Sequence, residues 1–284
     1  MIAAGIVLYN PQIGRLLENI TAITPQVDLL VLVDNGSSNI IEVQKALNTL
    51  EAKCVLIEND KNKGIACALN QLMDFARNNG AIWVLTLDQD SVCPSNLIES
   101  LSQYSNLDNI GIICPVIRDR SFGIFNPKHS SVINELNVCI TSASLTNVEA
   151  WYVVGGFDDT MFIDGVDTDF CLTLREHGYR IVQCNGVELI HEIGHSSKIV
   201  TLFGRRQVVF NHSAIRYFYM CRNIIYNNRK HPGYRPSPMR GLLTIGFRWL
   251  LTILFEKKRM KKTILMVKGV IEGFRVPINY QQNS

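Results

Sequence analysis

Residues 82–90 read Ile-Trp-Val-Leu-Thr-Leu-Asp-Gln-Asp, an apolar run that ends in two aspartates separated by one residue. Residues 82–87 have the length and composition of a strand that is buried on both faces. Such a strand belongs to a parallel sheet covered by helices, in which ligands bind beyond the carboxyl ends of the strands. We therefore predict that Asp88 and Asp90 lie at a binding edge, where both carboxylates can meet one divalent cation. A solvated turn that caps the next helix is the alternative.

The chain before this stretch alternates apolar strands with helix-like segments. This alternation is typical of an α/β domain with a mostly parallel central sheet flanked by helices. Polar residues again follow the strands, because Asn10 ends the first and Asp34 ends the second. The predicted strands are 2–9, 29–33 and 53–57, and the predicted helices are 13–23, 43–50 and 65–77.

The second half of the chain changes character. Strands are predicted at 109–114, 138–141 and 181–184, and an acidic segment, 158–169, leads into a predicted helix at 170–178. From residue 211 onward the pattern is mostly helical.

Composition limits the function classes. The chain has 284 residues, of which 47% are hydrophobic and 19% charged, so it can bury a sizeable core. Its eight cysteines form no CxxC pair, which favours free thiols in a reducing compartment. No signal peptide is expected at the start, and the best candidate for a membrane span, residues 241–255, is interrupted by Arg248.

Positive charge is concentrated near the C-terminus. Ten lysines or arginines and only two glutamates lie between Arg235 and Arg275, whereas the net charge of the whole chain is +3. Such a segment suits an anionic surface, and lipid headgroups are favoured over nucleic acid because no aromatic residues suited to base stacking are interleaved. A helix that packs on the catalytic body or on a partner subunit is the alternative.

Several further residues are candidates for chemistry. Asp34 could accept a hydrogen bond from a pyrimidine imide. In residues 62–64, Asn-Lys-Gly, the backbone can come close to a ligand at the same edge, and the lysine places a positive charge there. Asp167 could be a general base or a helix cap. His191, four residues before His195, could be a metal ligand.

Five motifs follow one another in an order that resembles family 2 glycosyltransferases of the GT-A fold, most closely the bacterial rhamnosyltransferases of polysaccharide assembly. The resemblance spans about residues 3–230. The motifs are Tyr-Asn-Pro at 9–11, Val-Asp-Asn-Gly-Ser at 33–37, Asn-Lys-Gly-Ile-Ala at 62–66 with Asn70, Leu-Asp-Gln-Asp-Ser at 87–91, and Gly-Gly-Phe-Asp at 155–158 with Phe-Ile-Asp at 162–164 and Val-Asp-Thr-Asp at 166–169.

The resemblance implies a role for each motif. It implies Mg²⁺ or Mn²⁺ as cofactor, with Asp88, Asp90 and His191 as metal residues. It implies Asp167 as the general base, with Asp169 as the alternative because Val166 stands where the family has Glu. Phe157, Asp158 and Asp169 are implied on the acceptor side. The residues implied in nucleotide-sugar binding are Tyr9, Asn10, Asp34, Asn62, Lys63, Gly64, Asp88 and Gln89.

The implied reaction is an inverting transfer of a sugar, L-rhamnose from dTDP-L-rhamnose, to a lipid-linked or growing polysaccharide such as O-antigen. Alternatives are a UDP-hexose donor, or an inactive nucleotide-binding scaffold. We expect a catalytic domain over 1–210, with a nucleotide-sugar half at 1–105 and an acceptor half at 106–210. We expect residues 211–284 to be a helical extension that holds the protein on the inner face of the cell membrane. A homo-oligomer is a further expectation.

Overall fold

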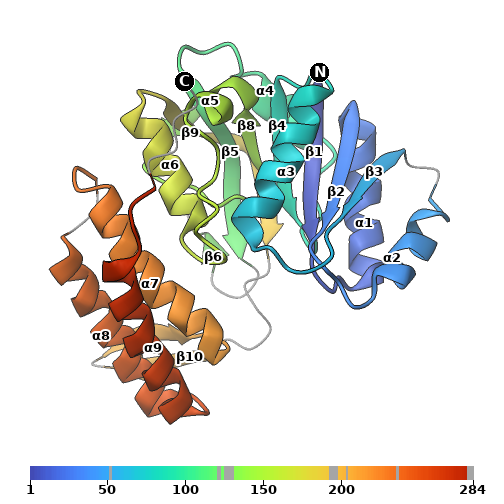
Figure 1. Cartoon of the computed structure of the whole chain (residues 1–284). Coiled ribbons are helices and arrows are strands. Elements are labelled where there is room, and N and C mark those ends of the chain that lie inside the picture. Colours follow the sequence, from blue (N-terminus) through green and yellow to red (C-terminus); the bar gives the residue numbers. More distant parts are fainter. Residues whose placement is uncertain are drawn as a thin grey trace.

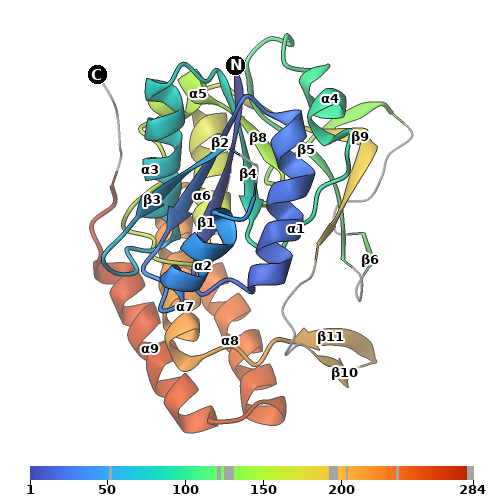
Figure 2. The ribbon, with the colours of Figure 1, turned by 90° about the vertical axis from the view of Figure 1, so that its right-hand side faces the viewer.

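The computed structural model describes residues 1–50, 53–119, 123–124, 131–191, 198–202, 204–234 and 237–279. A central sheet lies between two layers of helices, and three C-terminal helices lie together at one end of this body (Figures 1 and 2).

The first half of the chain forms the parallel part of the sheet. These strands lie in the order β3-β2-β1-β4, and all of their pairings are parallel. Asp34 and Asp88 end two of them, so both residues lie at the carboxyl edge. The strands are β1 (Ile2–Leu8), β2 (Leu29–Asp34), β3 (Cys54–Glu58) and β4 (Trp83–Asp88).

The second half completes a mixed sheet. β8 (Ser144–Asn147) pairs antiparallel with β4 and with β5 (Ile110–Asp119), and β9 (Arg180–His191) runs parallel to β5. The short strands β6 (Gly123–Ile124) and β7 (Ile133–Glu135) pair with β5 and β9. A separate hairpin is formed by β10 (Lys198–Leu202) and β11 (Arg205–Val209).

Side chains alternate between the two faces of the sheet. Ala3 of β1 packs with α3 (Ile65–Asn78), α5 (Val148–Val153) and α6 (Val166–Glu176), whereas Ala4 and Ile6 pack on the opposite face. The helices of that opposite face are α1 (Ile13–Ile23), α2 (Ile40–Leu47) and α4 (Leu97–Ser102), and the 3-10 helix η1 (Thr24–Gln26) follows α1. The predicted GT-A-like α/β architecture is therefore confirmed.

One predicted strand is wrong. Residues 138–141 are not a strand, and β8 begins instead at Ser144. The segment turns before it can pair, because the Thr86 hydroxyl donates to the Thr141 carbonyl at 2.6 Å and Ala143 has a positive φ of 60°. The other strands and helices of the first half lie within a few residues of their predicted bounds. All eight cysteines are free thiols, as predicted.

The C-terminal extension consists of α7 (Ala214–Lys230), α8 (Pro238–Phe255) and α9 (Arg259–Arg275). These helices share a small apolar core that contains Tyr217, Ile245 and Met266. In the part of the chain that the structure describes, α8 alone is long and apolar enough to cross a membrane by length and composition, and 22% of it is buried. The predicted boundary near residue 210 stays a prediction, since several hydrogen bonds join α7 to residues before it.

Candidate active site

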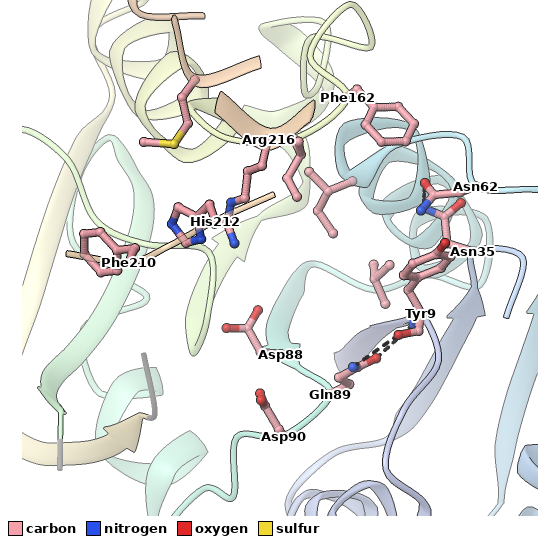
Figure 3. A pocket seen from close by; sticks show the side chains of 14 residues that line it. Tyr9, Asn35, Asn62, Asp88, Gln89, Asp90, Phe162, Phe210, His212 and Arg216 are labelled. Carbon is pink, nitrogen blue, oxygen red and sulfur yellow. Dashed lines mark hydrogen bonds between the residues drawn. The ribbon is translucent and has the colours of Figure 1, made fainter. Parts of the chain in front are cut away.

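A cleft of about 680 Å³ opens beyond the carboxyl ends of β1 and β4. One wall carries Tyr9, Asp88 and Asp90 from the strand ends, and the opposite wall carries His212 and Arg216 from the start of the C-terminal extension (Figure 3). The other residues that line the cleft are Val7, Asn35, Asn62, Ile65, Gln89, Phe162, Ile163, Phe210 and Met220.

The strand-end carboxylates have a defined scaffold. Asn19 donates to the Asp88 carbonyl at 2.7 Å, and Gln89 accepts a hydrogen bond from the Tyr9 backbone at 2.9 Å. The Asp88 and Asp90 side chains are exposed at the cleft, as their positions in sequence predict (Figure 3).

This donor set fits a hard divalent cation. Mg²⁺ in nucleotide sites is commonly held by one or two carboxylates, with substrate phosphates and water as its other ligands. Among the described residues, no group of three or more His, Cys, Asp or Glu side chains is placed to bind a metal. Asp88 and Asp90 would therefore hold the cation together with the substrate. His191 ends β9, but its side chain lies outside the described part of the structure.

Asp167 lies at the start of α6, in the first helical turn. It lines a second cavity of about 200 Å³, which shares Val7, Ile65 and Asp88 with the main cleft. The Thr141 hydroxyl donates to Asp167 Oδ1 at 2.9 Å. Burial raises the pKa of Asp167 to about 6, the Thr141 hydrogen bond opposes this shift, and the negative charge of Asp88 adds to it. A carboxylate with this pKa is ionised at neutral pH and basic enough to accept a proton.

Asp34 fixes the turn that follows β2. Its Oδ2 accepts hydrogen bonds from the backbone of Gly36 at 3.1 Å and of Ser37 at 2.9 Å. Its Oδ1 is buried and has no hydrogen-bond partner within the described part of the chain. Asp34 itself does not line the cleft, whereas the next residue, Asn35, does.

Asn62 lies in the cleft wall and is held there by its neighbours. Asn35 Nδ2 donates to Asn62 Oδ1 at 3.1 Å, and Asn62 Oδ1 also accepts from the backbone of Gly64 at 2.9 Å. Gly64 has a φ of 90°, and a Cβ at this position would lie 2.8 Å from Phe162 Cα. Gly64 therefore shapes the cleft through its backbone, by allowing residue 162 to approach α3.

Two residues predicted to bind the nucleotide sugar make contacts within the protein. Asn10 Oδ1 accepts hydrogen bonds from the backbone and hydroxyl of Ser38, so this side chain ties two loops together. The Lys63 ammonium lies 3.9 Å from Asp60, and Lys63 does not line the cleft. Both side chains contact the loops that surround the cleft, and their predicted role in nucleotide-sugar binding stays a prediction.

The three residues predicted on the acceptor side are buried, and their predicted role stays a prediction. Phe157, Asp158 and Asp169 are each only 2% exposed. Lys230 Nζ lies 2.8 Å from Asp158 and 3.0 Å from Asp169, so a buried ion-pair network joins α7 to the body. Burial alone would raise the pKa of Asp158, but Lys230 outweighs it and lowers that pKa. These three side chains hold residues 157–169 in place behind the cleft.

The contacts of this ion-pair network distinguish Asp169 from Asp167, the two candidates for the general base. Besides Lys230, Asp169 contacts the His231 ring at 2.9 Å, and its side chain is 2% exposed. Asp167 faces a cavity, whereas Asp169 faces α7. The geometry favours Asp167 as the base.

Sequence reasoning missed Phe210, which ends the preceding segment, and the three residues that the extension contributes, namely His212, Arg216 and Met220. The Arg216 guanidinium lies in the wall opposite Asp88 and Asp90 (Figure 3), where it pairs with the Asp164 carboxylate at 2.9 Å. Burial, together with the nearby Arg216 and Arg248, lowers the pKa of His212 to about 4, so its ring is neutral at pH 7. No motif in the sequence marks these positions.

A mixed sheet of this order, with two carboxylates after the fourth strand and a half-buried aspartate that shares a cavity with the first of them, is the arrangement of a GT-A nucleotide-sugar transferase. The chain belongs to glycosyl transferase family 2, whose family model matches residues 5–170. It is 30% identical over 290 residues to the dTDP-rhamnosyl transferase RfbF of Shigella flexneri, and the match covers 96% of each chain. The protein is therefore a glycosyltransferase.

Solved structures show the same fold. GalNAc-T7, solved with UDP, GalNAc and Mn²⁺, matches with a TM-score of 0.62 and 12% identity, over 81% of this chain and 48% of that one. The mannosyltransferase PcManGT of Pyrobaculum calidifontis, solved with GDP-Man and Mn²⁺, has a TM-score of 0.59 at 13% identity, over 97% and 75% of the two chains. S. aureus TarS 1–349 with UDP-GlcNAc has a TM-score of 0.60 at 10% identity, over 97% and 81%.

Proposed function

We infer that this glycosyltransferase transfers L-rhamnose from dTDP-L-rhamnose to a hydroxyl of a lipid-linked or growing polysaccharide, with inversion at the anomeric carbon. The observation that carries this proposal is the position of Asp167, in a cavity that shares Asp88 with the donor cleft. The likeness to the Shigella flexneri dTDP-rhamnosyl transferase supports the choice of donor.

The nucleoside would lie along the ends of β1 and β2. Asp34 Oδ1 is buried behind the cleft wall and has no hydrogen-bond partner in the described residues, so the imide N–H of thymine would reach it only after Asn35, which lines the cleft, moves aside. An unsatisfied buried carboxylate oxygen is costly, so a ligand that donates to it gains binding energy. Tyr9 is 49% exposed at the cleft and offers a ring face to the base.

The diphosphate would lie between the two walls. Mg²⁺ or Mn²⁺ held by Asp88 and Asp90 would neutralise charge on the departing dTDP. The Arg216 guanidinium lies on the opposite wall, where Asp164 shares its positive charge, whereas His212 contributes a neutral ring. Asp167 takes the proton of the acceptor hydroxyl as that oxygen bonds to the anomeric carbon and the bond to the phosphate oxygen breaks. A single displacement of this kind inverts the anomeric centre.

The extension supports attachment to the surface of an anionic membrane. The faces of α8 and α9 that point away from their shared core carry large apolar side chains, such as Leu243 at 74% exposed and Met260 at 80%. A soluble monomer rarely exposes so many. Lysines at 257, 258 and 261 lie beside them, and the sum of apolar burial and attraction to anionic lipids drives interfacial binding. We propose that the protein lies on the inner face of the cell membrane.

The decisive experiment measures nucleotide release from dTDP- and UDP-sugars with Mg²⁺, Mn²⁺ or EDTA, and with cell-derived lipid-linked glycan as acceptor. We expect metal-dependent turnover of dTDP-rhamnose alone. Turnover of a UDP-hexose would support the alternative donor. Tight dTDP binding without turnover for any acceptor would indicate an inactive scaffold, and the absence of any nucleotide binding would refute the proposal.

A further inference from the structure

A separate large cavity, which we call the lysine cavity, lies within the C-terminal extension. The proposed reaction makes no use of it. It has a volume of about 620 Å³, within the range of small-molecule sites. It is bounded by the segment that enters α7 and by the start of α9. The residues that line it are Asn211, His212, Ser213, Ala214, Ile215, Lys257, Lys258, Lys261, Lys262 and Leu265.

The lining is positively charged. None of the described residues that line the cavity is acidic, and four are lysines. Lys262 is 3% exposed and pairs with Glu256 at 2.6 Å, so its charge is balanced within the protein. The side chains of Lys257, Lys258 and Lys261 are exposed at the cavity. Three lysine ammonium groups around one cavity favour the binding of a multiply charged anion.

The cavity is built by buried contacts. Lys262 Nζ donates to Asn211 Oδ1 at 2.8 Å and to Glu256, which also accepts the hydroxyl of buried Tyr217. This network fixes the start of α9 against the segment that enters α7. Ala214 and Ile215, the first two residues of α7, also line the cavity, and the N-terminus of this 17-residue helix adds partial positive charge.

The cavity lies next to the donor cleft, because His212 lines both. On its other sides it borders exposed apolar side chains, including Ile215 in its own lining at 55% exposed and Met260 at 80%. An amphiphile could therefore place its anionic group among the lysines, its apolar tail over α8 and α9, and a bound sugar toward Asp167.

We propose that this lysine cavity binds the diphosphate of a lipid-linked acceptor. The inference rests on the proposed function, because it assumes that the acceptor glycan is carried on a lipid diphosphate. The cavity thereby orients the acceptor for transfer, and it distinguishes a lipid diphosphate from a free sugar.

The test uses the full chain and farnesyl diphosphate as the probe, with dTDP and Mg²⁺ present in excess so that the donor cleft is filled. Binding is measured by calorimetry for the wild type and for the triple variant Lys257→Gln, Lys258→Asn, Lys261→Gln. Asn is chosen at 258 because this position has a φ of 55°, which Asn tolerates. The matched control is Lys268→Gln, an exposed lysine of α9 that does not line the cavity.

We expect the triple variant to bind farnesyl diphosphate roughly tenfold more weakly or worse, and the control to bind within about twofold of the wild type. Unchanged binding by a triple variant with a normal unfolding temperature would overturn the proposal. Inorganic pyrophosphate that binds as tightly as farnesyl diphosphate would also overturn it. A triple variant that loses only its binding to phosphatidylglycerol vesicles would reassign the cavity to phospholipid headgroups.

The failure of this inference can be told apart from a failure of the proposed function. The lysine substitutions should leave dTDP affinity unchanged, because none of them lines the donor cleft. In activity assays, they should raise the KM for the lipid-diphosphate acceptor and leave the KM for the nucleotide sugar unaltered. A protein that binds farnesyl diphosphate through these lysines but does not bind dTDP would refute only the proposed function.

Discussion

The hydroxyl of Thr141 donates to Asp167 Oδ1 at 2.9 Å, and this bond counteracts the effect of burial on the proposed base. Because burial and Asp88 hold the pKa of Asp167 in the free enzyme at about 6, kcat/KM should fall as pH decreases through that value and the carboxylate becomes protonated. Thr141→Val removes a donor to the ionised form, which raises the pKa. We expect the acidic limb of the kcat/KM profile to move to higher pH.

The control for this prediction is Thr173→Val, the same change on α6, where the hydroxyl donates to the Asp169 carbonyl. It should leave the pH profile in place. An acidic limb that stays unmoved in Thr141→Val would argue that another group controls it.

Asp167→Asn should reduce kcat by a factor of roughly 10² to 10⁴, the usual contribution of a general base. The affinity for dTDP should remain close to that of the wild type. Asp169→Asn provides the contrast, because Asp169 contacts Lys230 and His231 and should affect stability before chemistry. If Asp169→Asn instead abolished turnover in a fully folded protein, the assignment of the base would be reversed.

Asp90→Asn should weaken the apparent affinity for Mn²⁺, because it removes one of two carboxylates at the cleft. Turnover should fall and recover in part at high metal concentration. Asp60→Asn is the matched control, since Asp60 is an exposed residue whose nearest cation is Lys63. Equal metal dependence in wild type and Asp90→Asn would exclude Asp90 as a metal residue.

Lys230→Met should lower the free energy of unfolding by about 3–5 kcal/mol, the usual cost of breaking a buried ion pair. Asp158 and Asp169 would lose the cation that they share. Denaturant unfolding measures the effect, with the exposed Lys268→Met as control. A midpoint equal to that of the wild type would mean that the network adds little stability.

Leu243→Asp combined with Ile264→Asp should weaken binding to phosphatidylglycerol vesicles, because it places charge on the exposed apolar faces of α8 and α9. Co-sedimentation measures the loss, and added salt should weaken the wild type as well. Ile41→Asp, on α2 and 64% exposed, is the control. Binding that responds equally to all of these changes would contradict attachment through the extension.

The positions of the donor-side carboxylates can be predicted from the sequence, because they depend on residues that are neighbours along the chain. Apolar strands followed at once by polar residues fix where Asp88 and Asp90 lie, since the carboxyl ends of parallel strands share one edge. The opposite wall depends on long-range packing. His212 reaches the cleft only because α7 is anchored to the body through Lys230 and through Asn223, which donates to the Ile163 carbonyl at 2.9 Å.

The acidic segment illustrates a different limit. Asp167 and Asp169 are two residues apart on a helix, so their side chains point to nearly opposite sides of α6. Which of them faces the cavity depends on the rotation of that helix, and the sequence pattern does not specify it. The buried partners Lys230 and His231 lie more than 60 residues away in sequence from Asp169.

The shared position of His212 has a consequence for the exchange of segments between related enzymes. The family model ends at residue 170, yet Phe210, His212 and Arg216 complete the donor cleft from beyond that point. A chimera joined near residue 210 would import a new donor wall together with a new lysine cavity. Recombination at this junction, in the laboratory or in a genome, would therefore change the handling of both substrates in a single step.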